Sequence, residues 1–273
     1  MLKITDDIEK SLCKEHAKLF EHTHKLLKLA NELSEIKFEP STTFEKITIL
    51  FFAKSRKTYW AISTLAGRGF GEDAGILLRS LLENLIDLYW ISIEPKERSK
   101  RFLDFASFTY REGFKKLEED KLHKHRGEQV SLQIKEEVLR DCQKIDARIL
   151  KSFQKYRKWA PMGRREMAKE IDRTLTNYKK IHKDEFLFLY DKAYWLLSNT
   201  AHLNPFALDD FIKPAGNKLI LREQPSKRHI ANWLILSFHI FLRIVDKIND
   251  VHKIGAEEKI QDLESRFAKN FGR

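Results

Sequence analysis

The side chains best suited to chemistry are charged groups set into the most apolar segment of the chain, residues 74–93. Arg79, Glu83 and Asp87 follow one another at intervals of four positions, so a helix places all three on one face. Burying charges among leucines is costly unless they are paired, and one carboxylate cannot satisfy every donor of a guanidinium. We therefore expect partners from another helix. Two interpretations stay open: a salt bridge that fixes helix register, or an Arg/Glu site facing an anionic or polar substrate.

A second polar stripe lies in the aromatic segment 183–202, where Asp191, Tyr194, Ser198 and His202 are separated by three, four and four positions. These intervals put them on one helical face. Ser198 and His202 come just before a proline, at an expected helix C-terminus whose dipole favours a protonated ring. The pair suits acid–base work with His202 as the titrating partner. The alternative is that His202 only caps the helix.

Other motifs are weak or absent. One Glu-x-x-His, at Glu21 and His24, has no second copy, and a di-iron bundle requires two, so we predict no metal site. The Walker, GxGxxG, HExxH and GxSxG motifs are missing, and we predict no cofactor. The Arg-x4-His signature of one class of helical RNases fails because Leu197 occupies the arginine position before His202. His239, among aromatic and aliphatic neighbours, is interpreted as a core histidine.

Positive charge is concentrated in one part of the chain. The net formal charge is +11, and residues 96–183 hold 25 Lys/Arg against 14 Asp/Glu, so the remainder sums to zero. Such a field attracts phosphate groups, and interleaved aromatic rings could stack on bases. The alternative is a solvated helical face, with Trp159 simply packed onto the core. The candidate ligand-binding residues here are Lys155, Arg157, Lys158, Trp159, Arg164 and Arg165, with Asp87 and Tyr194 on the apolar helices.

The elements that position these residues are predicted to be helices. The chain of 273 residues has only 10 Gly and 6 Pro and is 33% charged, which is typical of long amphipathic helices. Helices are expected at about 5–33, from a Ser41/Thr42/Thr43 cap to 65, and at 74–93, 164–177, 183–202 and 229–248, with a charged tail helix. Local strand pairing is conceivable only near 218–222. The fold class is all-α: a multi-helix bundle with a central buried helix and an exposed, charged helical pair at 96–125 and 129–158.

We predict a single domain over residues 1–273, with the core at about 41–95 and 183–250 and a basic helical segment at 96–182. Cys13 and Cys142 fit no disulfide framework or zinc spacing. The first residues do not read as a signal peptide. Apolar stretches are broken by charge well before about 18 residues. We expect a cytoplasmic protein that does not enter a membrane.

Three groups of residues resemble the prokaryotic helical family called domain of unknown function 5677. They are Ala74-Gly75-Ile76-Leu77-Leu78-Arg79-Ser80-Leu81-Leu82-Glu83-Asn84, then Lys158-Trp159 with Arg164-Arg165-Glu166-Met167-Ala168, then Tyr194 with Ser198-x-x-x-His202-x-x-Pro205. The resemblance covers about Phe44 to Asp246. It implies that Arg79, Glu83, Ser198 and His202 form the shared polar centre of the family, and it supplies no activity.

The leading hypothesis is a nucleic-acid-associated protein of bacterial defence or toxin type that acts on RNA. Arg79 would hold a phosphate, His202 would act as acid or base, and Glu83 would orient one of them. The first alternative is a non-catalytic helical adaptor or homo-oligomerising module whose polar residues organise the core. The second is a domain that binds a small anionic ligand such as a nucleotide.

Overall fold

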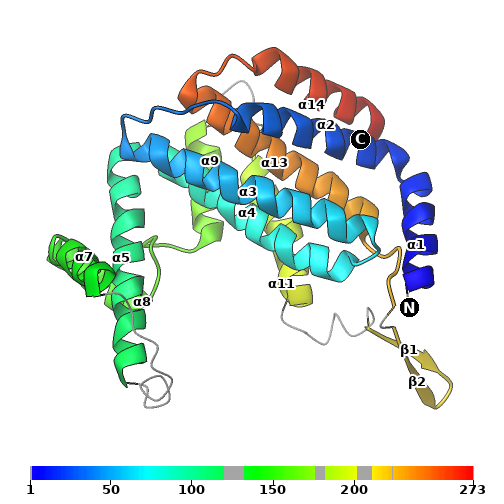
Figure 1. Cartoon of the computed structure of the whole chain (residues 1–273), viewed down its shortest axis with the longest axis horizontal. Coiled ribbons are helices and arrows are strands. Elements are labelled where there is room, and N and C mark those ends of the chain that lie inside the picture. The colour runs from blue at the N-terminus through cyan, green and yellow to red at the C-terminus, as the bar shows by residue number, and fades with distance from the viewer. Residues whose placement is uncertain (1, 120–131, 176–181, 202–210, 223, 273) are drawn as a thin grey trace. The chain divides into compact units, whose positions relative to one another are not determined.

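The computed structural model describes residues 2–119, 132–175, 182–201, 211–222 and 224–272. Most of these residues are helical, and their only sheet is a two-stranded hairpin, which confirms the all-α class (Figure 1). They form two compact units: unit 1 is Met1–Trp90 with Arg164–Arg273, and unit 2 is Ile91–Gly163. That the whole chain folds as one domain stays a prediction. No described helix is long and apolar enough to cross a membrane.

The N-terminal part of unit 1 contains α1 (Leu2–Glu15), α2 (Ala17–Ser34) and α3 (Thr43–Gly67). The single helix predicted for residues 5–33 is in fact two, because the backbone leaves helical geometry at His16 (φ −112°, ψ 26°). The predicted cap of the next helix is confirmed as a capping box. Thr42 Oγ1 accepts a hydrogen bond from the Glu45 N–H, and the Glu45 carboxylate accepts one from the Thr42 N–H.

The centre of unit 1 is formed by α4 (Gly71–Ile93) and α13 (Ile230–His252). From Leu81 to Ile91 every side chain of α4 is buried except Glu83, which is partly exposed. A Cβ atom on Gly75 would lie 3.2 Å from the ring nitrogen of Trp233, so glycine lets α4 approach α13 closely. In turn α13 packs against α2, α3 and the last helix, α14 (Glu257–Phe271). The predicted central buried helix is therefore present.

A chain of short helices follows on one side of α4. It consists of α9 (Arg164–Leu175), α10 (Glu185–Leu189), the π-helix η1 (Tyr190–Tyr194) and α11 (Trp195–Ala201). The helix predicted for 183–202 is therefore interrupted by a π-turn. The Asp172 carboxylate on α9 accepts the N–H groups of Phe186 and Leu187 at 3.0 and 2.8 Å, which caps α10 and fixes it to α9.

After α11, residues 212–221 form an exposed antiparallel hairpin of β1 (Ile212–Ala215) and β2 (Lys218–Leu221), with Ile212 opposite Leu221. The turn uses Gly216 at φ 60°, a left-handed conformation that glycine adopts without strain.

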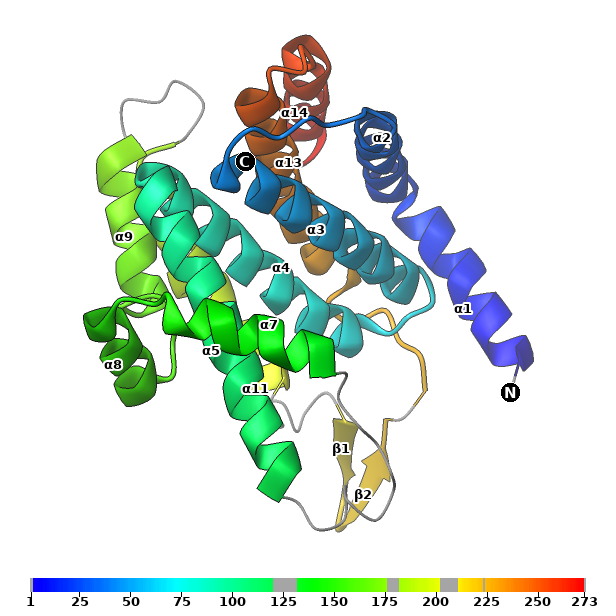
Figure 2. The same ribbon diagram turned by 60° about the vertical axis from the view of Figure 1, so that its left-hand side comes forward.

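Unit 2 consists of α5 (Pro95–Glu119), α7 (Leu132–Gln143) and α8 (Ala147–Tyr156), and α5 packs against the other two (Figure 2). The predicted helix at 129–158 is divided at Asp146, whose carboxylate accepts the N–H groups of Arg148 and Ile149 and begins α8. The charged helices bury a small core of their own, made of Phe108, Cys142, Ile145 and Phe153.

Candidate functional site

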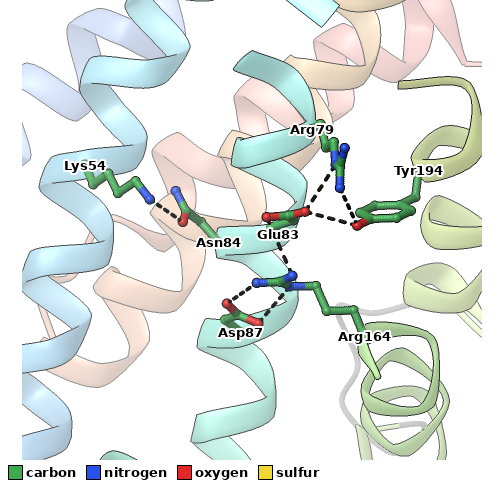
Figure 3. Close-up of polar contacts among 7 residues, drawn as sticks. All are labelled: Lys54, Arg79, Glu83, Asn84, Asp87, Arg164 and Tyr194. Carbon is green, nitrogen blue, oxygen red and sulfur yellow. Dashed lines mark hydrogen bonds and ion pairs between the residues drawn. The ribbon is translucent and has the colours of Figure 1, made fainter. Parts of the chain in front are cut away.

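The polar residues of α4 are joined to η1 by a closed triangle of hydrogen bonds (Figure 3). Arg79 Nε donates to Glu83 Oε1 at 3.2 Å, and Arg79 Nη2 donates to the Tyr194 hydroxyl at 2.9 Å. That hydroxyl donates in turn to Glu83 Oε1 at 3.2 Å. The Arg79 guanidinium also lies over the Tyr194 ring, 4.9 Å from its centroid. The expected partner from another helix is therefore Tyr194.

A second arginine enters the same cluster from α9. Arg164 Nε and Nη2 donate to the two oxygens of Asp87 at 3.2 and 3.1 Å, and Nη1 lies 3.6 Å from Glu83 Oε2. Burial lowers the pKa of Arg164, but the carboxylates of Asp87 and Glu83 more than offset this and raise it above its ordinary value. The guanidinium therefore stays charged, and α9 is held against α4 by a bidentate pair.

We call Arg79, Glu83, Asp87, Arg164 and Tyr194 the α4 network. It contains two guanidinium groups and two carboxylates, so its formal charges cancel. Both carboxylates accept hydrogen bonds from arginine, and Asp87 is the more deeply buried. A phosphate at Arg79 would compete with Glu83 and Tyr194 for the guanidinium. This geometry fits a network that holds three helical segments in register.

Within the stripe predicted on residues 191–202, Asp191 and Tyr194 contact different partners. Asp191 binds Arg165, which donates from Nε and Nη2 to the two carboxylate oxygens at 2.7 and 2.8 Å. The hydrogen bond from Arg165 lowers the pKa of Asp191. Tyr194 instead belongs to the α4 network and stacks on Tyr190, with ring centroids 4.5 Å apart. A π-turn takes more residues than an α-turn, so positions three apart within η1 diverge.

The proposed acid–base pair cannot be placed in the same way. Ser198 lies partly buried on α11, one turn beyond Tyr194. His202 lies outside the described residues. The Ser198–His202 pair and its approach to Arg79 therefore stay predictions.

The candidates at the end of α8 differ in exposure. Lys155, Arg157 and Lys158 are exposed, and Arg157 forms an ion pair with Glu112 at 3.0 Å. Trp159 is buried and meets the Phe102 ring edge to face, with centroids 5.1 Å apart. Its carbonyl oxygen accepts from Arg101 Nε at 2.6 Å. Trp159 therefore belongs to the core of unit 2, where its ring is not accessible to a base.

Three exposed cations lie on one side of α8. Two of them, Arg148 and Lys151, were not among the candidates predicted from the sequence. Arg148, Lys151 and Lys155 are spaced by three and four positions and are all exposed. Tyr156, at the end of the helix, is 52% exposed, and Lys155 Nζ lies 4.9 Å from its ring centroid. We call these four residues the α8 basic face. Helical spacing of the cations was the signal that could have found it.

A second buried ion cluster surrounds Arg243, and no pattern in the sequence predicted it. Arg243 of α13 is bound by Glu185 at 2.8 Å and by Glu264 at 3.0 Å, which ties α13 to α10 and α14. His239 lies one turn earlier, and burial lowers its pKa, in keeping with a core histidine. Among the described residues, no group of three or more His, Cys, Asp or Glu could hold a metal ion.

Comparison with known proteins identifies the family. The model of a family of unknown function (DUF5677) matches residues 45–219, which include the whole α4 network and the α8 basic face. The chain therefore belongs to this family, as the resemblance in the sequence predicted. No curated protein and no solved structure matches the chain.

Proposed function

We propose that this protein binds RNA, or a polyanion of similar charge, through the α8 basic face. The observation that carries the proposal is the exposed row of Arg148, Lys151 and Lys155 with Tyr156 at its end. Residues 147–165 contain no Asp or Glu, so no carboxylate from this stretch competes for the three cations. Lys and Arg side chains that replace phosphate counterions supply most of the non-specific affinity for nucleic acids.

The presence of one exposed aromatic ring favours a single strand. Bases of single-stranded RNA are free to stack on tyrosine, whereas those of a duplex are already stacked on each other. Tyr156 supplies such a ring beside Lys155. The proposed ligand is thus a single-stranded segment whose phosphates follow the cations and one of whose bases stacks on Tyr156.

The role we assign to the α4 network is positional. It joins α4, α9 and η1 within unit 1 through hydrogen bonds and ion pairs that use both of its carboxylates. The roles suggested from the sequence for Arg79 as a phosphate holder and His202 as an acid or base stay predictions, as does a setting in bacterial defence or a toxin system.

The test is binding of a fluorescently labelled single-stranded RNA to the full chain at low and moderate salt. The variant Arg148→Ala/Lys151→Ala/Lys155→Ala is expected to bind at least about tenfold more weakly, because several phosphate contacts are removed. Its control, Lys10→Ala/Lys14→Ala/Lys18→Ala, removes the same charge from exposed positions on α1 and α2 and is expected to bind nearly as the unaltered protein. Equal weakening of both variants would show that only net charge matters and would overturn the proposal.

A second candidate is a non-catalytic helical adaptor, which the charge balance of the α4 network favours. In that case Arg79→Ala lowers the stability of the fold. Any activity of the protein in cells is then lost only to the extent that less of the protein is folded. Loss of activity at full stability argues against the adaptor. The measurement is thermal unfolding of the variant beside its activity in cells.

A further inference from the structure

A groove between α2 and α3 of unit 1 has the features of a second ligand site. Its volume is about 270 Å³, and it is lined by His24, Leu27, Lys28, Asn31, Arg56 and Trp60. None of these residues is acidic. The volume is just below the range of drug-sized pockets, so the groove suits a single ring system with a small polar substituent.

The aromatic wall of the groove is largely exposed. Trp60 shows 65% of its surface, whereas Trp90 and Trp233 of the same unit are buried. An exposed indole is a platform on which a planar ring gains both apolar contact and favourable stacking.

Two cations, Lys28 and Arg56, line the groove and could bind an anion. Arg56 Nη1 donates to Asn31 Oδ1 at 2.7 Å and to Ser34 Oγ at 3.2 Å, which holds the guanidinium one helical turn from Trp60. Lys28 faces the groove from α2. The carboxylate one turn after it, Glu32, is bound to Lys259 at 2.8 Å.

We propose that this groove binds a nucleobase together with its phosphate. The base stacks on Trp60, and the phosphate is bound by Lys28 and Arg56. An indole beside two cations, with no acid in the lining, is complementary to a planar ring that carries negative charge. The ligand is either a free mononucleotide or one residue of a single-stranded RNA, since both present this chemistry.

The inference does not depend on the α8 basic face. It uses residues 24–60, whereas the proposed function uses residues 148–156, so each can fail while the other holds. The triple alanine variant of α8 is expected to bind a mononucleotide as the unaltered protein does.

Calorimetric titration of the full chain tests the groove. The probes are AMP, ribose 5-phosphate, which lacks the base, and an RNA pentanucleotide. Trp60→Ala is expected to weaken AMP binding at least about tenfold, since stacking on one aromatic ring is worth a factor of this order. Lys28→Ala is expected to weaken it about fivefold, because one exposed ion pair with the phosphate is lost. Trp195→Ala is the matched control, because Trp195 is also exposed, at 58%, and lies outside the groove.

The outcomes separate the two ligand sources. Binding of AMP that depends on Trp60 supports the proposal with a mononucleotide as ligand. If only the pentanucleotide binds and this binding depends on Trp60, the proposal holds with RNA as ligand. The proposal is overturned if ribose 5-phosphate binds as tightly as AMP, if Trp60→Ala binds as the unaltered protein does, or if none of the probes binds. Circular dichroism establishes that each variant is folded.

Discussion

Arg164, the first residue of α9, binds both carboxylate oxygens of Asp87 on α4, although 77 positions separate them in the chain. The next residue, Arg165, makes the same bidentate pair with Asp191. The two pairs differ in exposure: the side chains of Arg164 and Asp87 are 31% and 9% exposed, those of Arg165 and Asp191 are 44% and 37% exposed. Neighbouring arginines thus offer a matched comparison between an interior pair and a surface pair.

Removing Asp87 is expected to destabilise the protein substantially. Asp87→Ala leaves the Arg164 guanidinium without its bidentate partner, and breaking a buried pair costs about 3–5 kcal/mol. Because Arg164 is about a third exposed and water screens part of the charge, we expect a loss of about 2–3 kcal/mol in the free energy of unfolding. Urea unfolding measures this loss.

The surface pair provides the control for that measurement. Asp191→Ala removes the partner of Arg165 at a more exposed position, where ion pairs contribute at most about 1 kcal/mol. Equal losses in Asp87→Ala and Asp191→Ala would show that the α4 network contributes no more than an ordinary surface pair.

The hydroxyl of Tyr194 is expected to contribute to the same network. Tyr194→Phe keeps the ring under Arg79 but removes the group that bridges Arg79 and Glu83. A lost hydrogen bond to charged partners predicts destabilisation of about 1–2 kcal/mol in thermal or urea unfolding, with no change in RNA affinity. An unchanged stability together with altered RNA binding would move Tyr194 from a structural role to a ligand-binding one.

Two aromatic residues of unit 2 are expected to behave in opposite ways. Trp159 is buried and Tyr156 is 52% exposed. Trp159→Ala is expected to cost about 3–5 kcal/mol of stability, as truncations of buried large side chains do. Tyr156→Ala is expected to change stability by less than about 0.5 kcal/mol and to weaken RNA binding. The reverse pattern would contradict both assignments.

Helix periodicity made most of the fold predictable from the sequence. The partners of the charged residues could be predicted only in part. The spacing of Arg79 and Glu83 predicted their pairing, because residues four apart meet on any α-helix. The pairing of Asp87 with Arg164 depends on how α9 packs against α4, and no local pattern encodes it. The same holds for Arg243 with Glu185 and Glu264.

The helix bounds and the side-chain positions that were predicted wrongly from the sequence have local physical causes. Breaks at His16 and Asp146 interrupt stretches whose apolar spacing continues across them, so periodicity alone reads each as one helix. The π-helix at Tyr190–Tyr194 changes the angular spacing between residues that would share one face of an α-helix. Asp191 and Tyr194 therefore contact different partners. Trp159 lies among cations in the sequence, a setting that fits a ring exposed to bases as well as one packed onto the core, and its burial shows that the second interpretation is right.

Two histidines of unit 1 are expected to make the fold sensitive to acid. His22 and His239 both meet the ring of Phe267 on α14 edge to face, with centroids 5.4 and 5.0 Å apart, and burial lowers the pKa of each. The folded state therefore favours the neutral rings. Their contribution to stability is present above the ordinary pKa of about 6.5 and is lost as the pH falls below it.

Urea unfolding between pH 7.5 and 5.5 tests whether stability is lost as the pH falls. The free energy of unfolding is expected to fall over this interval, and the double variant His22→Gln/His239→Gln is expected to show a shallower fall from a lower starting stability. Equal slopes in both proteins would exclude the two histidines as its source.

The central claim, that exposed cations of α8 contact phosphates, is tested most directly by the salt dependence of RNA binding. The logarithm of the association constant is plotted against the logarithm of the salt concentration for the unaltered protein and for Lys151→Ala. Each phosphate contact on a single strand contributes about 0.7 to the slope, so we expect the variant to show a slope smaller by about this amount. A slope identical to that of the unaltered protein would contradict the account.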